Sequence, residues 1–271
     1  MAVYGAGSNG LHAERHYTMR RQGITQMRWA KLHEWNVAPG EARAIQEKLR
    51  AKWEGQDRLP RIQTIAGLDA AFVLTGSQAF KKHSRWKALR DANRAIGGVI
   101  LFRYPEMVEL ERAHAVVPLR FPYVPGFLSF REIPALLAAL KKLKHSPDLL
   151  FCDGQGYAHP RRMGLATHLG ILLDRPTLGC AKSILIGNHG ELARTAGSWT
   201  ALTDEGGERI GAAVRTRDDV KPVYVSQGHR ISLESAIRWT LLVSDGVRIP
   251  RPTRAADHYV SEVKRKLIRN L

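Results

Sequence analysis

The pattern of apolar and polar positions predicts a helix followed by a strand meander in the first half of the chain. An amphipathic helix is expected at residues 41–53, where Ile45, Leu49 and Trp53 recur every fourth residue. Short apolar runs bounded by turn residues then predict strands at 64–74, 98–103 and 107–117. Because only residues 104–106 separate the last two runs, we expect these strands to be antiparallel neighbours.

The second half alternates between helical and extended patterns. The expected elements are a helix at 134–143, a strand at 148–153, a helix at 162–173 and a strand at 177–181. Peripheral strands are expected at 209–215 and 223–226, and helices at 232–243 and 253–269. Such alternation indicates parallel strands joined by crossover helices. The fold class is therefore α/β: an antiparallel meander, then parallel strands, flanked by helices. This is the order of an RNase H-like mixed sheet, although the pattern alone leaves other α/β folds open.

Composition adds a domain organisation to this picture. With 271 residues, 44% of them hydrophobic, the chain is long enough for one large domain. Residues 1–31 lack a sustained apolar period and are expected to be a poorly ordered basic arm before a domain at 32–271. Residues 81–94, KKHSRWKALRDANR, form a basic insert with six Lys or Arg and one acid. The insert is either a grip on phosphates, with Trp86 stacking on a base, or a solvated loop with Trp86 packed on the domain.

The net charge indicates the kind of partner. A formal charge of +17 and a pI near 10.3 favour a polyanion, with nucleic acid the first candidate and an anionic membrane surface the second. No apolar run approaches the roughly 20 residues that span a bilayer, and the N-terminus lacks an apolar signal core, so we expect a cytoplasmic protein. Cys152 and Cys180 lie in apolar runs and are expected to be small core residues.

Two aspartates lie in apolar runs, where burial of a carboxylate costs desolvation free energy. Asp69 lies inside the apolar run TIAGLDAAFVL, and Asp153 ends the run DLLFCD. If both lie on neighbouring strands, the two carboxylates repel each other unless a cation lies between them, and Mg²⁺ with its preference for oxygen ligands suits that position. The alternative for each aspartate is a Lys or Arg partner, or a helix cap.

The segment RFPYVPGFLSFRE, residues 120–132, raises two further possibilities. Its prolines stiffen the backbone around Tyr123, which then serves either as a rigid wedge or as a packed tyrosine in a turn. Ser129 and Glu132 have capping-box spacing, but Pro134 disfavours helical backbone just before it. We therefore expect the helix to begin at Pro134, which leaves Glu132 as a third acidic ligand or a holder of metal-bound water.

Six ordered blocks resemble the endonuclease V family of inosine-directed DNA repair nucleases, from about Leu32 to the C-terminus. They are AGLDAAF (66–72), PYVPGFLSFRE (122–132), DGQGYAHPRRMGLATHLG (153–170), PTLGCAKS (176–183), SQGHRISLESA (226–236) and IPRPTRAADHY (249–259). Any one block is a weak signal, whereas six in order are specific.

The resemblance implies roles for individual residues. The metal-binding acids would be Asp69, Glu132, Asp153 and Asp257, where the family has Asp or His at the position of Asp257. Lys182 would face the scissile phosphate or the attacking water, and His159 would lie beside the metal site. The plain alternatives are a solvated Asp257 near a helix N-terminus, a surface lysine and a packed structural histidine.

The resemblance also implies a substrate site and a reaction. The wedge would be Tyr123 with Pro122, Val124 and Pro125, and the pocket for the displaced base would be formed by Gly126, Leu128, Gly154, Gly156 and Leu165. A monomer using Mg²⁺, with Mn²⁺ as a substitute, would nick DNA at the second phosphodiester 3′ to deoxyinosine and leave 5′-phosphate and 3′-hydroxyl ends. The rivals are an inosine-specific endoribonuclease, a non-catalytic nucleic-acid binder and a membrane-surface protein.

Overall fold

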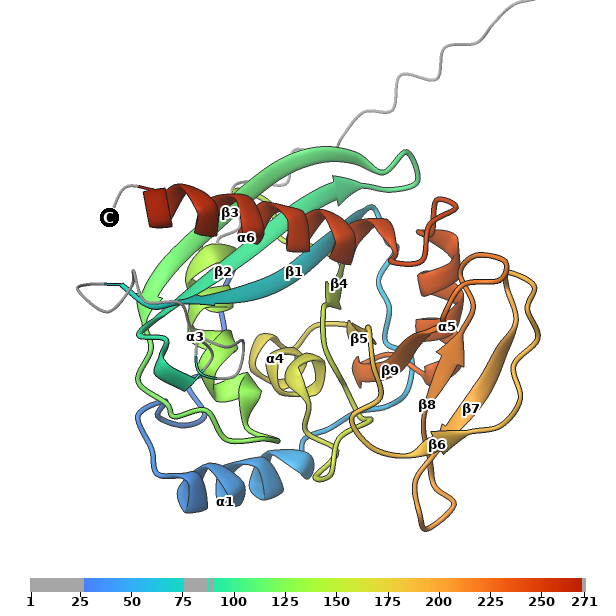
Figure 1. Cartoon of the computed structure of the whole chain (residues 1–271), viewed down its shortest axis with the longest axis horizontal. Helices are drawn as coiled ribbons and strands as arrows, with labels where there is room; N and C mark the ends of the chain where they lie inside the picture. Colours follow the sequence, from blue (N-terminus) through green and yellow to red (C-terminus); the bar gives the residue numbers. More distant parts are fainter. Residues whose placement is uncertain (1–26, 76–86, 88–89, 270–271) are drawn as a thin grey trace, which may run out of the picture.

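A nine-stranded mixed sheet organises the molecule, as the computed structural model shows for residues 27–75, 87 and 90–269 (Figure 1). The strands are β1 (Thr64–Val73), β2 (Arg94–Arg103), β3 (Val108–Pro118), β4 (Leu149–Cys152), β5 (Thr177–Ala181), β6 (Asn188–His189), β7 (Trp199–Thr203), β8 (Arg209–Val214) and β9 (Val223–His229). The helices are α1 (Pro39–Arg50), α3 (Leu128–Leu140), α4 (Leu165–Leu173), α5 (Leu233–Leu242) and α6 (Arg251–Arg269).

The strand order is β3-β2-β1-β4-β5-β9-β8-β7-β6. Strands β3, β2 and β1 form the expected antiparallel meander, and β1, β4 and β5 are parallel. The predicted mixed α/β sheet is therefore confirmed. The segments expected to be peripheral, β8 and β9, instead continue the sheet, because β9 pairs directly with β5.

Helices cover both faces of this sheet. The core on one face joins the strands to α3 and α4, and the core on the other face joins them to α5 and α6. Glycines let the helices approach closely: a Cβ at Gly97 would lie 2.3 Å from the Ala135 backbone of α3, and a Cβ at Gly98 would lie 2.3 Å from the Val260 side chain of α6. Adjacent residues of β2 therefore receive helices from opposite faces.

One helix boundary differs from the prediction. Helix α3 begins at Leu128 rather than at Pro134, so Pro134 lies inside it and Glu132 belongs to the helix. The N-cap is Phe127 without a side-chain cap. Burial explains the difference, because Phe130 is 2% exposed and stacks on Phe121 with ring centroids 5.2 Å apart. Packing thus outweighs the hydrogen bond that proline removes.

The segments predicted to be an arm and an insert fall largely outside the described residues. This holds for residues 1–26 and for most of 81–94, including Trp86. The end of the predicted arm packs on the domain, since Met27 is buried and the Ala30 N–H donates to the Leu172 carbonyl at 2.9 Å. Arg94 forms the start of β2. Both cysteines are free and buried, as expected of core residues. In the described part of the chain, no helix is long and apolar enough to span a membrane.

Candidate active site

The two aspartates lie on neighbouring parallel strands, Asp69 within β1 and Asp153 directly after the end of β4. Asp69 follows Leu68 in β1, Asp153 comes directly after β4, and the Asp153 N–H donates to the Leu68 carbonyl at 2.9 Å. The register pairs Leu68 with Cys152, so β4 stops where β1 carries its carboxylate. The sheet thereby brings the two carboxylates close enough for the charge of Asp153 to act on Asp69.

Two further acids reach this point from opposite faces of the sheet. Glu132 comes from α3, and Asp257 comes from α6. The close approaches at Gly97 and Gly98 set the depth at which each helix lies. The structure therefore brings the four acids named by the sequence into one cluster, within electrostatic reach of each other.

The carboxylates of this cluster are held in an unfavourable environment. Burial and the charge of Asp153 raise the pKa of Asp69 to about 8, against the opposing hydrogen bond from the Ala70 N–H at 2.8 Å. Burial, then Asp69 and Asp153, raise the pKa of Glu132 well above its usual value. The cluster therefore favours either protons or an additional cation.

Lys182 supplies one positive charge. Its Nζ lies 2.6 Å from Asp153 Oδ2 and 2.9 Å from Asp257 Oδ2, which makes it a bridge between two acids and not an isolated surface lysine. Burial lowers the pKa of Lys182, but the Asp153 and Asp257 carboxylates outweigh that effect and raise it. One ammonium against four carboxylates leaves the cluster with excess negative charge.

The donor set fits a hard divalent cation, since carboxylate oxygens are the ligands of Mg²⁺. As the side chains stand, no three His, Cys, Asp or Glu residues of the described ranges are grouped closely enough to hold a metal ion. Lys182 is the group that lies between Asp153 and Asp257 in this arrangement. The chemistry of the cluster thus suits a cation, which would require the lysine and the carboxylates to adjust.

The predicted wedge is a short, anchored loop. Gly126 has a φ of +79°, and the Phe127 N–H donates to the Val124 carbonyl at 3.1 Å, which closes a tight turn. The Gly126 carbonyl accepts hydrogen bonds from His159, Arg161 and Gln46. Three donors on one carbonyl hold the loop firmly against α1 and the turn after β4.

The exposed part of this loop carries the predicted wedge residues. Tyr123 is half-buried, with the Arg131 guanidinium 5.7 Å from its ring centre. Pro122 and Pro125 are exposed, whereas Val124 packs beside a small aromatic cluster. The ring is therefore supported from beneath and flanked by two rigid, accessible residues.

His159 has a supporting role in this arrangement. Its Nε2–H donates to the Gly126 carbonyl at 2.9 Å, and its Nδ1 accepts from the backbone N–H groups of Arg161 and Met163. Burial, with a smaller effect of Arg161, lowers the pKa of His159 to about 4, so the ring is neutral. Among the described residues, no hydrogen bond of His159 reaches the acidic cluster, and its contacts match the packed histidine that the sequence left open.

The predicted pocket residues lie in three different settings. Gly154 and Leu165 adjoin each other, since a Cβ at Gly154 would meet Leu165 at 3.4 Å, and Leu128 is 40% exposed. Gly156 instead packs on β9, where a Cβ would lie 2.3 Å from the Gln227 carbonyl oxygen. Gly126 serves the loop anchor described above. Gly154 and Leu165 are therefore in contact at the turn after β4, while Gly156 permits the close packing of that turn on β9.

Sequence reasoning missed two features beside Lys182. Ile184 and Leu185 are 36% and 47% exposed, and the Gln155 side chain donates to the Ser183 carbonyl at 2.9 Å, which ties these apolar residues to the glycine-rich turn. Arg248 donates to the carbonyls of Lys182 at 2.7 Å and Pro222 at 2.9 Å. An apolar ILI run directly after a candidate catalytic lysine was the available signal for the first feature. Contacts between distant segments gave no signal for the second.

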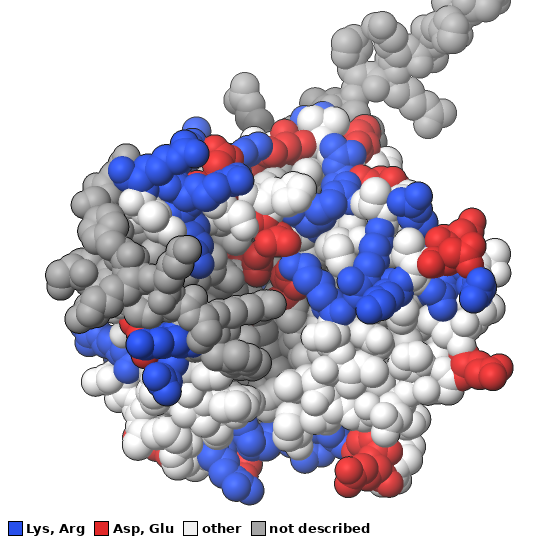
Figure 2. Space-filling model, in the orientation of Figure 1, with Lys and Arg blue, Asp and Glu red and all other residues white. Residues whose placement is uncertain are grey.

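The molecular surface also carries acidic and basic residues in separate areas. Figure 2 shows acidic side chains gathered at the centre of one face, with Lys and Arg on both sides of them. A polyanion is attracted to the flanks, while the centre attracts cations. This distribution suits an enzyme that acts on nucleic acid with a bound metal.

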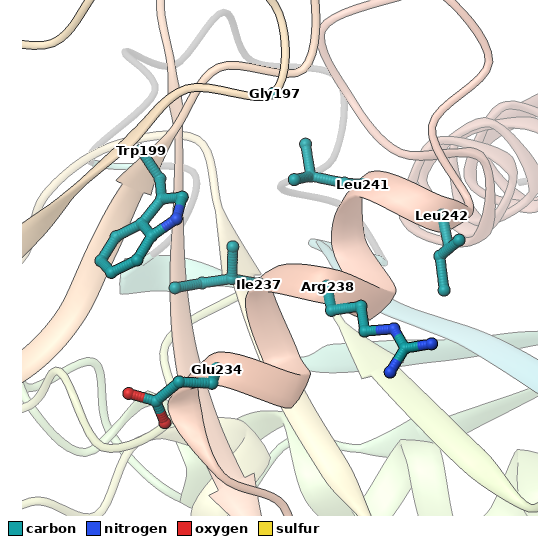
Figure 3. A pocket seen from close by; sticks show the side chains of 7 residues that line it. All are labelled: Gly197, Trp199, Glu234, Ile237, Arg238, Leu241 and Leu242. Atoms are coloured by element: carbon teal, nitrogen blue, oxygen red, sulfur yellow. The ribbon is translucent and has the colours of Figure 1, made fainter.

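A separate hollow lies between β7 and α5 (Figure 3). It has a volume of about 450 Å³, and Trp199 and Ile237 are among its apolar lining residues. Its one carboxylate, Glu234, is paired with Arg209 at 2.6 Å. This hollow lacks the clustered acids of a hydrolytic centre, so we assign the active site to the cluster around Asp69.

An RNase H-like sheet with one carboxylate inside β1 and another directly after β4 is typical of nucleases, which are hydrolases of phosphodiester bonds. Comparison with known proteins gives the family. The family model for endonuclease V matches residues 44–258, and the chain belongs to the endonuclease V family.

Individual relatives agree with this assignment. Endonuclease V of Roseiflexus castenholzii is 46% identical over 85% of this chain and 95% of the relative, and that of Trichormus variabilis is 48% identical over 84% and 96%. The crystal structure of endonuclease V from Streptomyces avermitilis matches with a TM-score of 0.76 and 35% identity, over 90% of this chain and 99% of that chain. The catalytic domain of human endonuclease V matches with a TM-score of 0.74 and 32% identity, over 84% and 96%.

Proposed function

We propose that this protein nicks DNA at the second phosphodiester bond 3′ to deoxyinosine and leaves a 5′-phosphate and a 3′-hydroxyl. The observation that carries the proposal is the convergence of Asp69, Glu132, Asp153 and Asp257 around Lys182. A related endonuclease V from Ciona intestinalis, 26% identical with a TM-score of 0.67, was crystallised with DNA containing an inosine, which supports this substrate.

Each part of the site has a role in this proposal. Asp69 and Asp153 hold the metal, with Glu132 and Asp257 as further carboxylates around it. Lys182 now bridges Asp153 and Asp257, and in this proposal its ammonium would contact the scissile phosphate or the attacking water. Because this lysine bridges both acids in the free protein, it keeps the cluster partly neutralised until substrate and metal arrive.

The four acids would hold Mg²⁺, for which Mn²⁺ would substitute, and the cation would supply stabilisation of phosphate charge and activation of water. The four carboxylates provide the oxygen ligands and exclude soft metals that prefer sulfur or nitrogen.

Lesion recognition is assigned to the anchored loop. Tyr123 enters the stack where the inosine leaves it, and Pro122 and Pro125 keep the ring in place. Extrusion of a mispaired base costs only a few kcal/mol, and stacking on an aromatic ring recovers part of it. The extruded base lies beside Gly154, Leu165 and Leu128. His159 acts by holding the Gly126 carbonyl and thereby the loop.

Inosine-containing RNA is the second candidate substrate. The observation that favours it is that the DNA bound to the Ciona relative carries a ribo-adenosine after the inosine. Paired oligonucleotides that differ only in the sugars at and after the inosine separate the two substrates, because contacts to the 2′-hydroxyl decide between them.

The test is strand nicking of a labelled duplex with one deoxyinosine, in Mg²⁺ and in EDTA, beside an inosine-free duplex. Asp69→Asn is the active-site variant, and Glu205→Gln, an exposed acid, is the matched control. We expect a Mg²⁺-dependent nick 3′ to the inosine that Asp69→Asn abolishes and Glu205→Gln retains. Tight binding without a nick on both DNA and RNA would instead indicate a non-catalytic binder.

A further inference from the structure

Strand β1 is longer than the strand beside it, and the excess length starts at the active site. The pairing of β1 with β4 covers only Ile65–Leu68, whereas β1 continues to Val73 in its pairing with β2. Among the described residues, no strand pairs with residues 69–73 on the other side. The acidic cluster therefore lies at one end of an open strand edge.

Helix α6 runs along this part of the sheet (Figure 1). Val260 packs over Gly98, the partner of Asp69, and Val263 packs with Val73 and Ile96 near the far end of the strands. Asp257 and Lys264 are seven residues apart, which places them on the same flank of the helix. A rise of about 1.5 Å per residue puts Lys264 about 10 Å further along α6 than Asp257.

Lys264 differs from the other lysine of its turn. Lys266 is exposed and paired with Glu262 at 2.7 Å. Lys264 is half-buried, and burial lowers its pKa. In the described part of the chain it makes no hydrogen bond or ion pair, so its charge is partly removed from water without a counter-charge.

We propose that Lys264 and the flank of α6 that carries it, together with the open edge of β1, form a track for the phosphodiester backbone on one side of the scissile phosphate. This inference builds on the proposed function, which supplies the substrate. A strand of duplex DNA carries one phosphate per about 3.4 Å of axis, so a distance of about 10 Å corresponds to roughly three phosphates beyond the cleavage point. The track leads from the acidic cluster, where a cation is required, to a site where an anion is required.

The test compares Lys264→Met with Lys266→Met. Both variants keep an apolar stem and remove one charge from the same helix, but only the first removes a cation that has no ion-pair partner among the described residues and lies on the flank of Asp257. Binding of an inosine-containing duplex is measured in EDTA between 50 and 300 mM salt. We expect Lys264→Met to weaken binding several-fold at low salt and to reduce the salt slope by about 0.9, the value for one phosphate contact. Lys264→Arg should retain wild-type binding, and Lys266→Met should lose little.

Duplex trimming locates the contact. The difference between wild type and Lys264→Met should disappear when one arm is cut to fewer than about three nucleotides from the scissile bond, and persist when the other arm is cut. Equal losses in Lys264→Met and Lys266→Met, or a difference that survives trimming of both arms, would overturn the track. So would an unchanged duplex affinity with loss of binding to anionic lipid vesicles.

The readouts separate this inference from the proposed function. Nicking by the wild-type protein in Mg²⁺ is recorded in parallel. If wild type fails to nick while Lys264→Met shows the length-dependent loss of binding, the track stands and the nuclease assignment fails. If the wild-type protein nicks normally and Lys264→Met binds as wild type does, the nuclease assignment stands and the track fails.

Discussion

The acidic side chains that the protein gathers at its active site destabilise one another. Glu132 is 7% exposed, and burial together with Asp69 and Asp153 raises its pKa. Below the unfolded-state pKa both states hold the proton, so there is no penalty. Above it, only the unfolded state releases its proton without cost, and stability falls as pH rises. At pH 8 the metal-free protein therefore carries an electrostatic cost at this residue.

Replacing Glu132 by its neutral isostere should therefore stabilise the metal-free protein and inactivate it. In EDTA at pH 8 we expect Glu132→Gln to raise the free energy of unfolding by about 1 kcal/mol or more, because one pKa unit corresponds to about 1.4 kcal/mol. Nicking should be abolished. Urea unfolding with and without Mg²⁺ measures the effect, and Mg²⁺ should shrink it because a bound cation compensates the charge.

Glu111→Gln is the control of opposite sign. Glu111 accepts hydrogen bonds from the backbone of Lys144 and His145 at 2.8 and 3.0 Å, and despite partial burial these bonds lower its pKa. Its replacement should destabilise the protein. A loss of stability in Glu132→Gln comparable to that in Glu111→Gln would contradict the view that the active-site carboxylates repel one another.

The helices of the active site depend on small residues in the sheet. Gly97 allows α3 to approach so closely that an added Cβ would lie 2.3 Å from backbone atoms, which cannot yield as a flexible side chain does. We expect Gly97→Ala to destabilise the protein by about 1–3 kcal/mol, the range for overpacking. The displacement of α3 moves Glu132, so kcat for nicking should fall at temperatures where the variant is folded.

Gly190→Ala is the matched control, since nothing lies within 4 Å of the added Cβ. Circular dichroism melting and single-turnover nicking measure the two effects. If Gly97→Ala retained wild-type kcat after losing stability, the position of α3 would not govern the reaction.

The same elements show how far the sequence predicts this structure. The strands around Asp69 and Asp153 were predicted correctly, because buried parallel strands leave continuous apolar runs. The start of α3 was wrong, since burial of Phe130 and Ile133 depends on distant residues that no local pattern contains. Strand β7 was not predicted because its five residues are short of a continuous apolar run and only one of them, Leu202, is fully buried. The site acids were named in advance, whereas the Arg248 contact depends on segments that only the fold brings together.

At the scale of the whole molecule, the net charge and the local charge of the acidic centre have opposite signs. A formal charge of +17 favours association with nucleic acid, while acidic side chains gather at the centre of one face (Figure 2). Long-range attraction thus acts toward a polyanion, whereas the acidic centre repels phosphate unless protons or a cation offset its charge. Neither the sign nor the size of the net charge reveals this division, because it depends on where the acids are placed.

Buried histidines give the whole molecule a defined response to acid. Burial lowers the pKa of His33, His159, His168 and His229 in the folded state, and it lowers that of His159 to about 4. Between this value and the unfolded-state pKa near 6.5, the unfolded chain binds protons that the folded chain does not, so stability falls as pH decreases. For His159 alone, the loss at pH 5 amounts to about 2 kcal/mol.

We therefore expect the free energy of unfolding in urea to decrease from pH 7 to pH 5, and His159→Gln to remove about 2 kcal/mol of that decrease. His159→Gln also weakens the anchor on the Gly126 carbonyl, so the relevant quantity is the difference between the two pH values and not the stability at either one. His258→Gln, a substitution of an exposed histidine, is the control. An equal pH dependence in wild type and His159→Gln would mean that the Arg161 and Arg162 charges and the apolar surroundings of His159 do not keep it neutral. The histidine that holds the loop carrying Tyr123 would then gain a proton between pH 7 and pH 5 as readily in the folded protein as in the unfolded chain.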